Sequence, residues 1–216
     1  MAASLAGPLA TALGATAARC SAELAELADS LRPVTARVHT RGRGSFSGIG
    51  AGVVWSASGL VVTNAHVVPG ARGRWPIVEL ADGRAFEARL VARDPRRDLA
   101  LLALEESTGA LQPARIGDAR VLRVGQLVAA FGHPLGIHDA LALGIVHGVR
   151  GDDDPWLRAD LRLAPGNSGG PLATLDGAVV GINSMIVNGL GIAIPSHLVQ
   201  DFVRGEVDFA DERVGA

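Results

Sequence analysis

The stretch that most constrains the interpretation of this chain lies between residues 165 and 171 and reads Pro165-Gly166-Asn167-Ser168-Gly169-Gly170-Pro171. Glycine has no Cβ, so such a segment can turn sharply and let another group approach its backbone closely. The N–H groups of Gly166 and Ser168 can then point at one spot before the Ser168 hydroxyl, where a tetrahedral oxyanion would form during acyl transfer. The alternative is a tight turn between two strands that contains a serine by chance.

A serine between glycines is also typical of the nucleophile elbow of α/β-hydrolases, in which the acid and then the histidine follow the serine. In this chain His197 is the only histidine after Ser168, and the chain ends at residue 216. An α/β-hydrolase would have to complete its fold in the 48 residues after Ser168, so this fold is not expected. We therefore expect the histidine that would activate Ser168 to precede it.

Two candidate partners of Ser168 lie earlier in the chain. His66 follows an apolar run in Thr63-Asn64-Ala65-His66-Val67-Val68, and Asp98 precedes one in Arg97-Asp98-Leu99-Ala100-Leu101-Leu102. An imidazole can take the serine proton and return it to a leaving amine, and a carboxylate can orient the imidazole. The alternatives are a half-buried histidine bonded to a backbone carbonyl and an aspartate paired with a neighbouring arginine.

The order His66, Asp98, Ser168 is the order of chymotrypsin-type proteases and differs from the subtilisin and α/β-hydrolase orders. Together with the segment Gly191-Ile192-Ala193-Ile194-Pro195-Ser196, the three motifs resemble the HtrA/Deg branch of trypsin-like serine proteases. The resemblance runs from about residue 48 to about residue 200. It is reinforced by three shorter matches: Leu80-Ala81-Asp82-Gly83-Arg84, Phe131-Gly132-His133-Pro134-Leu135-Gly136 and Gly181-Ile182-Asn183-Ser184.

The resemblance implies a catalytic triad and an oxyanion hole. Ser168 would be the nucleophile, His66 the general base and Asp98 the residue that orients His66, with the backbone N–H groups of Gly166 and Ser168 as the oxyanion hole. The implied function is a serine endopeptidase that cleaves unfolded or exposed protein segments through an acyl-enzyme. Two alternatives stay open: a catalytically silent peptide-binding or chaperone-like module on the same scaffold, and an esterase that uses the same triad.

The resemblance also implies a pocket for the side chain before the scissile bond, with Leu163, Ile186 and Leu190 as its walls. All three are apolar, so we expect a preference for aliphatic or small side chains. Arg162 stands six positions before Ser168, where trypsin-like specificity would place an acid. Cleavage after Lys or Arg is therefore not expected.

The resemblance covers a protease domain only, and we expect no PDZ domain of the kind that commonly follows it in this family. The loop between the first two strands and Gly151–Pro155 are short. We therefore expect a protease whose loops are preset, acting on polypeptides as a monomer or a homotrimer. Residues 1–18 lack the charged start of a signal peptide, so a cytoplasmic location is favoured, while the resemblance leaves a periplasmic or extracellular one open.

From residue 34 onward, short runs rich in Val, Ile and Leu are separated by glycine, which is the pattern of an all-β barrel or sandwich. Asp82-Gly83 and Asp176-Gly177 are typical of hairpin turns. With the resemblance, the pattern predicts an all-β fold of two antiparallel six-stranded β-barrels. Strands are expected near residues 34–40, 48–55, 59–63, 76–81, 85–92, 99–104, 124–131, 140–149, 157–163, 171–174, 178–185 and 190–194.

Short helices are expected at both ends. Leu24, Leu27 and Leu31 have helical spacing after Ser21, a candidate N-cap, and Pro33 should end that helix. A closing helix is expected over 196–205. The predicted organisation is an Ala-rich, helical segment at 1–33, a first barrel at 34–104 with His66 and Asp98, a connection at 105–120, a second barrel at 121–205 with Ser168, and a polar tail at 206–216.

Composition excludes several function classes. The net charge of −2 gives no general attraction to nucleic acid or to acidic membranes, and no stretch has the length of a membrane span. Cys20 is the only cysteine, so an internal disulfide is ruled out. The spacing of His133, His138 and His147 matches no usual ligand pattern, and residues 152–154 lack the alternation of a calcium loop. No metal or cofactor is expected.

Overall fold

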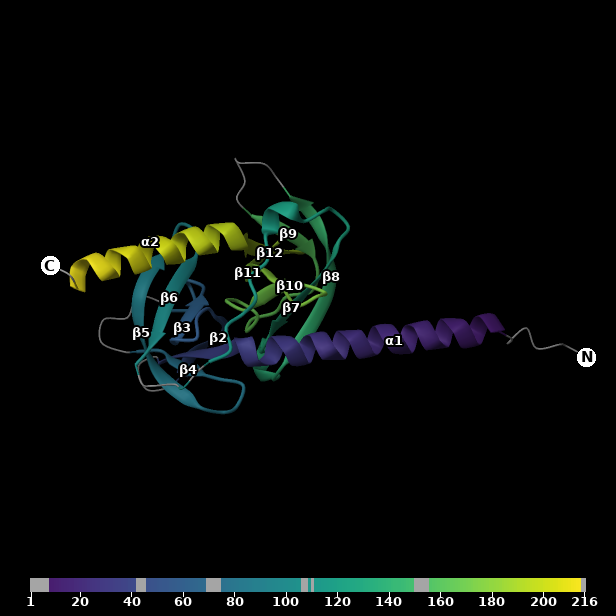
Figure 1. The fold of residues 1–216 in the computed structure, drawn as a ribbon, viewed down its shortest axis with the longest axis horizontal. Coiled ribbons are helices and arrows are strands. Elements are labelled where there is room, and N and C mark those ends of the chain that lie inside the picture. The colour runs from purple at the N-terminus through teal and green to yellow at the C-terminus, as the bar shows by residue number, and fades with distance from the viewer. Residues whose placement is uncertain are drawn as a thin grey trace, which may run out of the picture.

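Two closed β-barrels, each made of six antiparallel strands, form the body of the protein (Figure 1). The computed structural model describes residues 8–41, 46–68, 75–105, 109, 111–149 and 156–214. The strands of the first barrel, in hydrogen-bonded order, are β1 (Thr35–Arg41), β2 (Phe46–Val54), β3 (Leu60–Thr63), β6 (Leu99–Leu104), β5 (Ala85–Asp94) and β4 (Ile77–Glu79). Those of the second are β10 (Pro171–Thr174), β11 (Val179–Val187), β12 (Leu190–Pro195), β9 (Leu157–Asp160), β8 (Ala140–Val149) and β7 (Leu127–Gly132). The predicted fold is confirmed.

The pattern of buried and exposed side chains in each strand depends on whether one or both of its faces pack against other elements. In β5 buried and exposed side chains alternate over its first half, as they do when only one face of a strand meets the core. In β6 nearly every side chain is buried. Ala100, Leu102 and Leu104 face the core of the first barrel, whereas Leu99 and Leu101 belong to a second cluster outside it. The continuous apolar run of β6 therefore serves two cores.

That second cluster lies between the barrels and holds them together. It combines Leu99 and Leu101 with Phe131, Ile182 and Ile194 of the second barrel. Both helices also contribute to it, with Leu27 and Leu31 from one and Val199, Phe202 and Val203 from the other. Burial of this many large apolar side chains at one junction fixes the barrels relative to each other.

Helix α1 (Pro8–Leu31) packs on the body only through its last turns, where Leu27 and Leu31 are buried. The rest projects away from the second barrel (Figure 1), and residues 14–23 are exposed. The helix is longer than the expected 21–31, because the preceding residues are rich in alanine, the strongest helix former, and Ser21 continues the helix rather than capping it. The helix ends before Pro33, as expected, and passes into a 3₁₀ turn, η1 (Arg32–Val34).

Helix α2 (Ser196–Val214) begins beside the second barrel and runs along the first (Figure 1), and it reaches beyond the expected end at residue 205. Gly205 does not interrupt it, since a glycine inside a helix costs only about 1 kcal/mol. Residues 206–214, expected as a tail, are therefore helical. Two further 3₁₀ turns are η2 (Ala119–Val121) and η3 (Pro134–Gly136).

The strands begin and end close to the expected residues, with two differences that shape the site. The ninth strand stops at Asp160 rather than 163, so Leu161–Leu163 are free of the ladder, and the eleventh extends to Val187. The expected hairpin turns are present, with positive φ at Gly83 (+85°) and Gly177 (+80°). Residues 42–45, in the loop between the first two strands, and the loop 151–155 lie outside the described residues.

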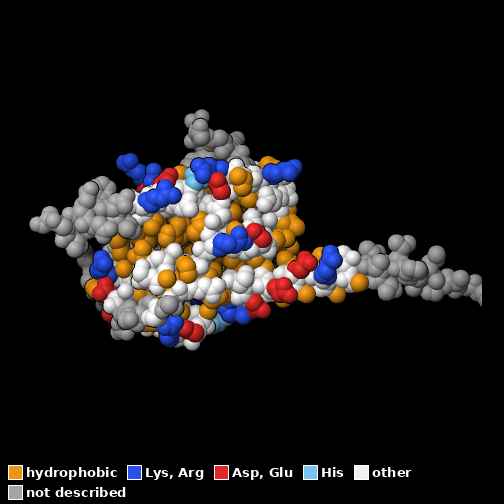
Figure 2. Space-filling view, in the orientation of Figure 1, with side chains coloured by type: hydrophobic (Ala, Val, Ile, Leu, Met, Phe, Trp, Pro, Cys, Tyr) orange, Lys and Arg blue, Asp and Glu red, His pale blue; other side chains and the backbone are white. Residues whose placement is uncertain are grey.

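Charged side chains lie on the coloured parts of both helices, with hydrophobic side chains visible between the helices (Figure 2). No helix in the described part of the chain is long and apolar enough to cross a membrane. The face shown in Figure 2 does not gather charge of one sign, consistent with the small net charge.

Candidate active site

The side chains of His66 and Asp98 are in direct contact at the ends of two strands of the first barrel. His66 lies just after β3 and Asp98 just before β6. The imidazole Nδ1 is 2.8 Å from Asp98 Oδ2 and 3.0 Å from Oδ1, and the backbone N–H of His66 donates to Oδ1 (3.0 Å). With Nδ1 donating to the carboxylate, a neutral imidazole keeps the lone pair on Nε2, which makes Nε2 a proton acceptor.

Asp98 adopts an unusual backbone conformation, with φ of +56°. Aspartate tolerates this left-handed region better than most residues. The turn is held by the Asp98 carbonyl oxygen, which accepts bonds from the N–H of Ala65 (3.1 Å) and from the amide of Asn64 (3.0 Å). The segment Thr-Asn-Ala-His and the segment Arg-Asp-Leu are thus joined by backbone as well as side chains.

The Asp98 carboxylate is kept ionised in a buried place. The residue is only 9% exposed, and burial by itself raises the pKa of its carboxyl. Hydrogen bonds from the side chains of His66 and Ser184 and from the His66 backbone together outweigh burial and hold the pKa below its ordinary value. A carboxylate in this state can orient an imidazole without taking its proton.

Ser184 connects Asp98 to Ser168. Its hydroxyl donates to Asp98 Oδ2 over 2.5 Å, and its carbonyl oxygen accepts a bond from the Ser168 hydroxyl over 2.9 Å. Ser184 lies at an irregularity of β11, between Asn183 and Met185, where the register with β12 shifts. Ser184 belongs to one of the motifs of the resemblance, but no role was predicted for it, although a serine next to an asparagine in an apolar strand is a signal of a specific polar contact.

The loop that carries Ser168 is tied to the first barrel. The carbonyl oxygen of Ser168 accepts a bond from the N–H of Ala51 in β2 (2.7 Å), and the Ala51 carbonyl accepts one from the hydroxyl of Thr63 (2.7 Å), three residues before His66. The hydroxyl of Ser168 donates to Ser184 O, and within the described residues no hydrogen bond joins it to His66. The structure thus brings all three predicted residues to one site but does not pair the hydroxyl with the imidazole.

Gly166 has φ of +108° and touches the backbone of the loop after β7. A Cβ there would lie 2.3 Å from the carbonyl oxygen of His133, so only glycine fits. The preceding carbonyl, that of Pro165, accepts a bond from the N–H of Leu135 (2.9 Å). In a trans peptide the C=O and N–H point in opposite directions, so the N–H of Gly166 points away from Leu135.

Neither the N–H of Gly166 nor that of Ser168 donates a hydrogen bond to another described residue. The N–H groups on either side do: that of Asn167 donates to Ala164 O (3.0 Å) and that of Gly169 to Asn183 O (2.8 Å). The bonds of Asn167 and Gly169 therefore fix the loop that carries Ser168, while the N–H groups of Gly166 and Ser168 stay available as donors. Such a pair suits an oxyanion.

The three predicted pocket residues gather around Gly191. In the ladder Gly191 is paired with Ile186, and Leu190 with Val187. The side chain of Leu163 lies 3.2 Å from where a Cβ of Gly191 would be. Leu163 and Leu190 are half-buried and Ile186 is exposed, so the surface that they offer is apolar and open to solvent.

Two of the three histidines considered above are neighbours, since the rings of His133 and His138 lie edge to face with their centroids 6.2 Å apart. His133 is buried, and burial lowers its pKa to about 4. Its Nδ1 accepts a bond from the N–H of Asp139 (3.3 Å), and His138 Nε2 accepts one from Arg37 (2.8 Å). His147 is exposed on β8. Among the residues that the structure describes, no three metal-binding side chains lie together.

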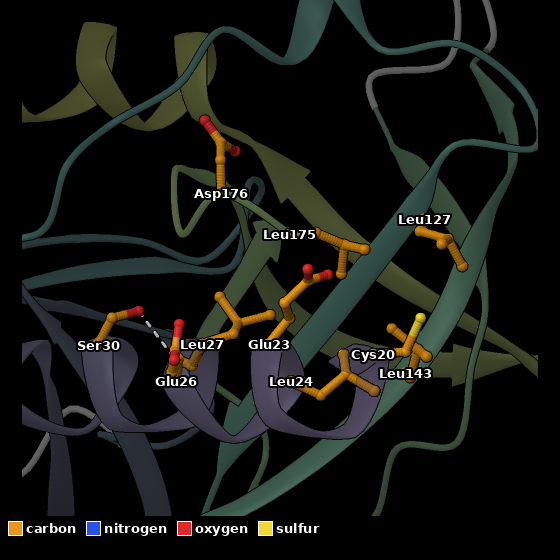
Figure 3. A pocket seen from close by; sticks show the side chains of 10 residues that line it. All are labelled: Cys20, Glu23, Leu24, Glu26, Leu27, Ser30, Leu127, Leu143, Leu175 and Asp176. Carbon is orange, nitrogen blue, oxygen red and sulfur yellow. Dashed lines mark hydrogen bonds between the residues drawn. The ribbon is translucent and has the colours of Figure 1, made fainter. Parts of the chain in front are cut away.

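A groove of about 540 Å³ runs beside α1 (Figure 3). Leu24 and Leu27 of the helix line it together with Leu127 and Leu143 of the second barrel, and Cys20 lies at one side. It shares no residue with the site around Ser168. The groove is where the projecting helix leaves the body.

Comparisons with known proteins identify the family of the chain. A family model described as a trypsin-like peptidase domain matches residues 50–182. The chain is 39% identical over 180 residues to a probable periplasmic serine endoprotease DegP-like of Halomonas elongata, with 78% of this chain and 36% of that protein covered. It is 41% identical over 172 residues to a protein of the same description from Marinomonas sp., with 74% and 36% covered.

The periplasmic serine endoprotease DegP of Escherichia coli K12 is 35% identical over 183 residues, with 79% of this chain and 38% of that protein covered. The chain thus spans well under half the length of these relatives. The family model alone covers more than half of the chain, from β2 to β11. The resemblance inferred from the motifs is confirmed, and the chain belongs to the trypsin-like peptidase family.

Proposed function

We propose that this chain is a serine endopeptidase in which Ser168 is the nucleophile, His66 the general base and Asp98 the residue that orients His66. One observation carries the proposal: a single residue, Ser184, bonds to both Asp98 and Ser168, while Asp98 holds the imidazole through Nδ1. These contacts support a site where acid, base and hydroxyl act together.

The reaction starts with a rotation of the Ser168 hydroxyl from Ser184 O toward His66 Nε2. The hydroxyl oxygen attacks the scissile carbonyl carbon as its proton passes to Nε2, and the carbonyl oxygen becomes an oxyanion. The N–H groups of Gly166 and Ser168 donate to this oxyanion. When the intermediate collapses, the C–N bond breaks, the proton on Nε2 goes to the leaving amine, and an ester to Ser168 remains. Water, activated by His66, then hydrolyses the ester.

The substrate is an extended polypeptide segment. Residues 185–187 of β11 pair with β12 on one side, whereas on the other side the pairing with β10 covers only residues 179–182. A peptide can add as a strand along this free edge, with main-chain bonds that give affinity. Only unfolded or exposed segments can adopt that conformation, so segments buried inside a folded protein are excluded.

Selectivity comes from the apolar surface formed by Leu163, Ile186 and Leu190. A small or aliphatic side chain before the scissile bond would bury apolar area there, and a charged one would lose its hydration without a partner. Arg162 is exposed and offers no counter-charge for Lys or Arg. Cleavage after aliphatic or small residues is the expected outcome.

The names of the relatives place those proteins in the periplasm. For this chain a periplasmic location is compatible with the family, and the cytoplasmic location expected from the sequence stays a prediction. Fractionation of the source cells decides between them. Polypeptides are the proposed substrates in either compartment, and the monomeric or trimeric state is for sedimentation to measure.

The test is cleavage of an unfolded protein by the purified chain, with the cut sites mapped by mass spectrometry. Ser168→Ala is the matched control, because it removes one oxygen and leaves the backbone donors in place. We expect cuts after aliphatic or small residues with the wild-type chain and none with the variant. A folded wild-type chain that binds the unfolded protein without cutting it would belong to the silent peptide-binding alternative. Hydrolysis of simple esters without cleavage of any peptide would favour the esterase.

A further inference from the structure

The loop between β7 and β8, residues 133–139, contacts the Pro165–Gly166 peptide, whose N–H is one of the two proposed oxyanion donors. The N–H of His133 donates to Gly166 O (3.2 Å), and the N–H of Leu135 donates to Pro165 O (2.9 Å). Gly166 also lies against the His133 carbonyl, with no room for a Cβ between them. A shift of this loop would therefore move the peptide that orients the N–H of Gly166.

The loop has two hydrogen bonds of its own: the N–H of Asp139 donates to Nδ1 of the buried His133 (3.3 Å), and the N–H of Ile137 donates to Pro134 O (2.8 Å). Leu135 and Ile137 are 76% and 60% exposed, so neither anchors the loop by burial. Leu135 and Asp139 have φ of +53° and +56°. Such left-handed conformations cost about 1–2 kcal/mol for a residue with a Cβ. A loop with strained residues and little apolar burial needs ties from elsewhere in the fold.

Those ties come from the N-terminal side of the first barrel. Arg37 Nη1 in β1 donates to His138 Nε2 (2.8 Å), and Arg32 Nε in η1 donates to Asp139 Oδ2 (3.0 Å). They lie at a cleft of about 320 Å³, which Arg37, His138 and Asp139 line. Two adjacent residues of the loop are thus bonded to guanidinium groups from outside their own barrel.

Arg37 is itself fixed before it meets the loop. Its Nη2 pairs with Glu79 Oε1 of the neighbouring strand β4, and Glu79 Oε2 also bonds to His39 Nε2 (3.2 Å). The side chains of Arg37 and Glu79 are 19% and 25% exposed. A planar guanidinium held in this way offers Nη1 in a fixed direction to His138, which is exposed at the surface of the loop.

We propose that Arg37 and His138 act as positioning residues for the oxyanion hole: their bond across the two barrels holds loop 133–139, which holds the Pro165–Gly166 peptide with its N–H toward the substrate. This inference rests on the proposed function. Neither residue touches the reacting atoms. The bond requires an acceptor at position 138, so the amide oxygen of glutamine can replace the imidazole nitrogen and a leucine cannot.

The test compares His138→Leu with His138→Gln and with the control His147→Leu, which removes an exposed histidine from the same hairpin. Two readouts are taken on the full chain. The first is kcat and KM for a peptide substrate. The second is hydrogen–deuterium exchange of the segments that contain the amides of Leu135 and Asn167, both of which donate in the folded state.

We expect His138→Leu to lower kcat by about 10- to 100-fold with KM changed by less than about threefold, because the donor acts on the transition state. Exchange in both segments should become at least about tenfold faster. His138→Gln should keep kcat and the exchange rates near their wild-type values, and His147→Leu should leave kcat and the exchange rates unchanged. Arg37→Leu should reproduce the effects of His138→Leu, and the double variant should add little to either.

A folded His138→Leu variant with wild-type kcat would overturn the inference, whatever its exchange. A wild-type chain without turnover would instead refute the proposed function. In that case the exchange of the segment around Asn167 decides the inference alone. Faster exchange in His138→Leu supports the proposed role of the Arg37–His138 bond, and unchanged exchange contradicts it. A thermal melt of each variant shows that it is folded at the temperature used.

Discussion

The hydroxyl of Ser168 donates to the carbonyl oxygen of Ser184 over 2.9 Å, while the hydroxyl of the same Ser184 donates to Asp98 over 2.5 Å. One residue of β11, in the second barrel, therefore contacts both the proposed nucleophile and the acid that the first barrel supplies. The contact joins the two barrels at the place where the proposed chemistry occurs.

Loss of any of the three proposed triad residues should abolish most of the turnover. We expect Ser168→Ala and His66→Ala to lower kcat by about 10⁶, and Asp98→Asn to lower it by about 10⁴, the sizes of loss known for triads of this type. Initial rates on a fluorogenic peptide with an aliphatic residue before the cleaved bond provide the measurement. Retention of most of the activity by either alanine variant would refute the assignment.

Removal of the Ser184 hydroxyl should weaken catalysis without removing it. Ser184→Ala takes away one bond to the Asp98 carboxylate, and a bond to a buried charge is worth about 1.5–3 kcal/mol. The pKa of Asp98 should rise, since that bond is one of those that lower it. We expect kcat to fall by about 10- to 100-fold, while Ser184→Thr, which keeps a hydroxyl, should fall less. Equal losses in the two variants would mean that packing, not the bond, matters at this position.

Most of the fold follows from the sequence because its signals are local. Apolar runs separated by glycine set the strands, and the turns at Gly83 and Gly177 adopt the positive φ that Asp-Gly pairs favour. The ends of the helices are predicted less well from the sequence. Ser21 has the chemistry of an N-cap, but the alanines before it extend α1 back to Pro8, and nothing local marks where a helix that projects into solvent must start.

The site is only partly encoded in local patterns. The contact between His66 and Asp98 could be expected from their motifs and order, whereas their catalytic roles stay predictions. The part played by Ser184 depends on an irregularity in β11, and the bond of Arg37 to His138 depends on how the barrels face each other. Both are tertiary relationships between residues far apart in the chain, and no periodicity reports them.

A methyl group on residue 166 should damage the oxyanion hole. In Gly166→Ala the Cβ would lie 2.3 Å from the carbonyl oxygen of His133, so the peptide must move, and φ of +108° is strained for alanine. Loss of one oxyanion donor costs about 10²- to 10³-fold in kcat. We expect that loss in a fluorogenic assay, with a smaller change in KM. An unchanged kcat in a folded Gly166→Ala variant would contradict the assignment of this N–H.

Buried His133 should make the fold less stable in acid. Its pKa of about 4 in the folded chain lies below the ordinary 6.5, because burial disfavours the charged form. As the pH falls below about 6.5, the unfolded chain takes up a proton there and the folded chain does not. Stability is therefore complete above pH 6.5 and is lost progressively down to about pH 4, by roughly 3 kcal/mol for a shift of this size.

Urea unfolding at pH 7 and pH 4.5 measures this effect. His133→Asn keeps an acceptor for the N–H of Asp139 but cannot be protonated, so its free energy of unfolding should fall less between the two pH values than that of the wild type. His147→Asn, at an exposed position, should behave as the wild type. An equal fall in His133→Asn and wild type would show that other groups cause the acid sensitivity.

The central claim is that the imidazole of His66, from the first barrel, activates the hydroxyl of Ser168, from the second. The most direct measurement is the rate of covalent labelling by a fluorophosphonate, with the modified residue located by mass spectrometry. We predict a single label on Ser168 in the wild type and labelling slowed by several orders of magnitude in His66→Ala. A folded chain that takes up no label, or one that is labelled at the same rate without His66, would contradict the account.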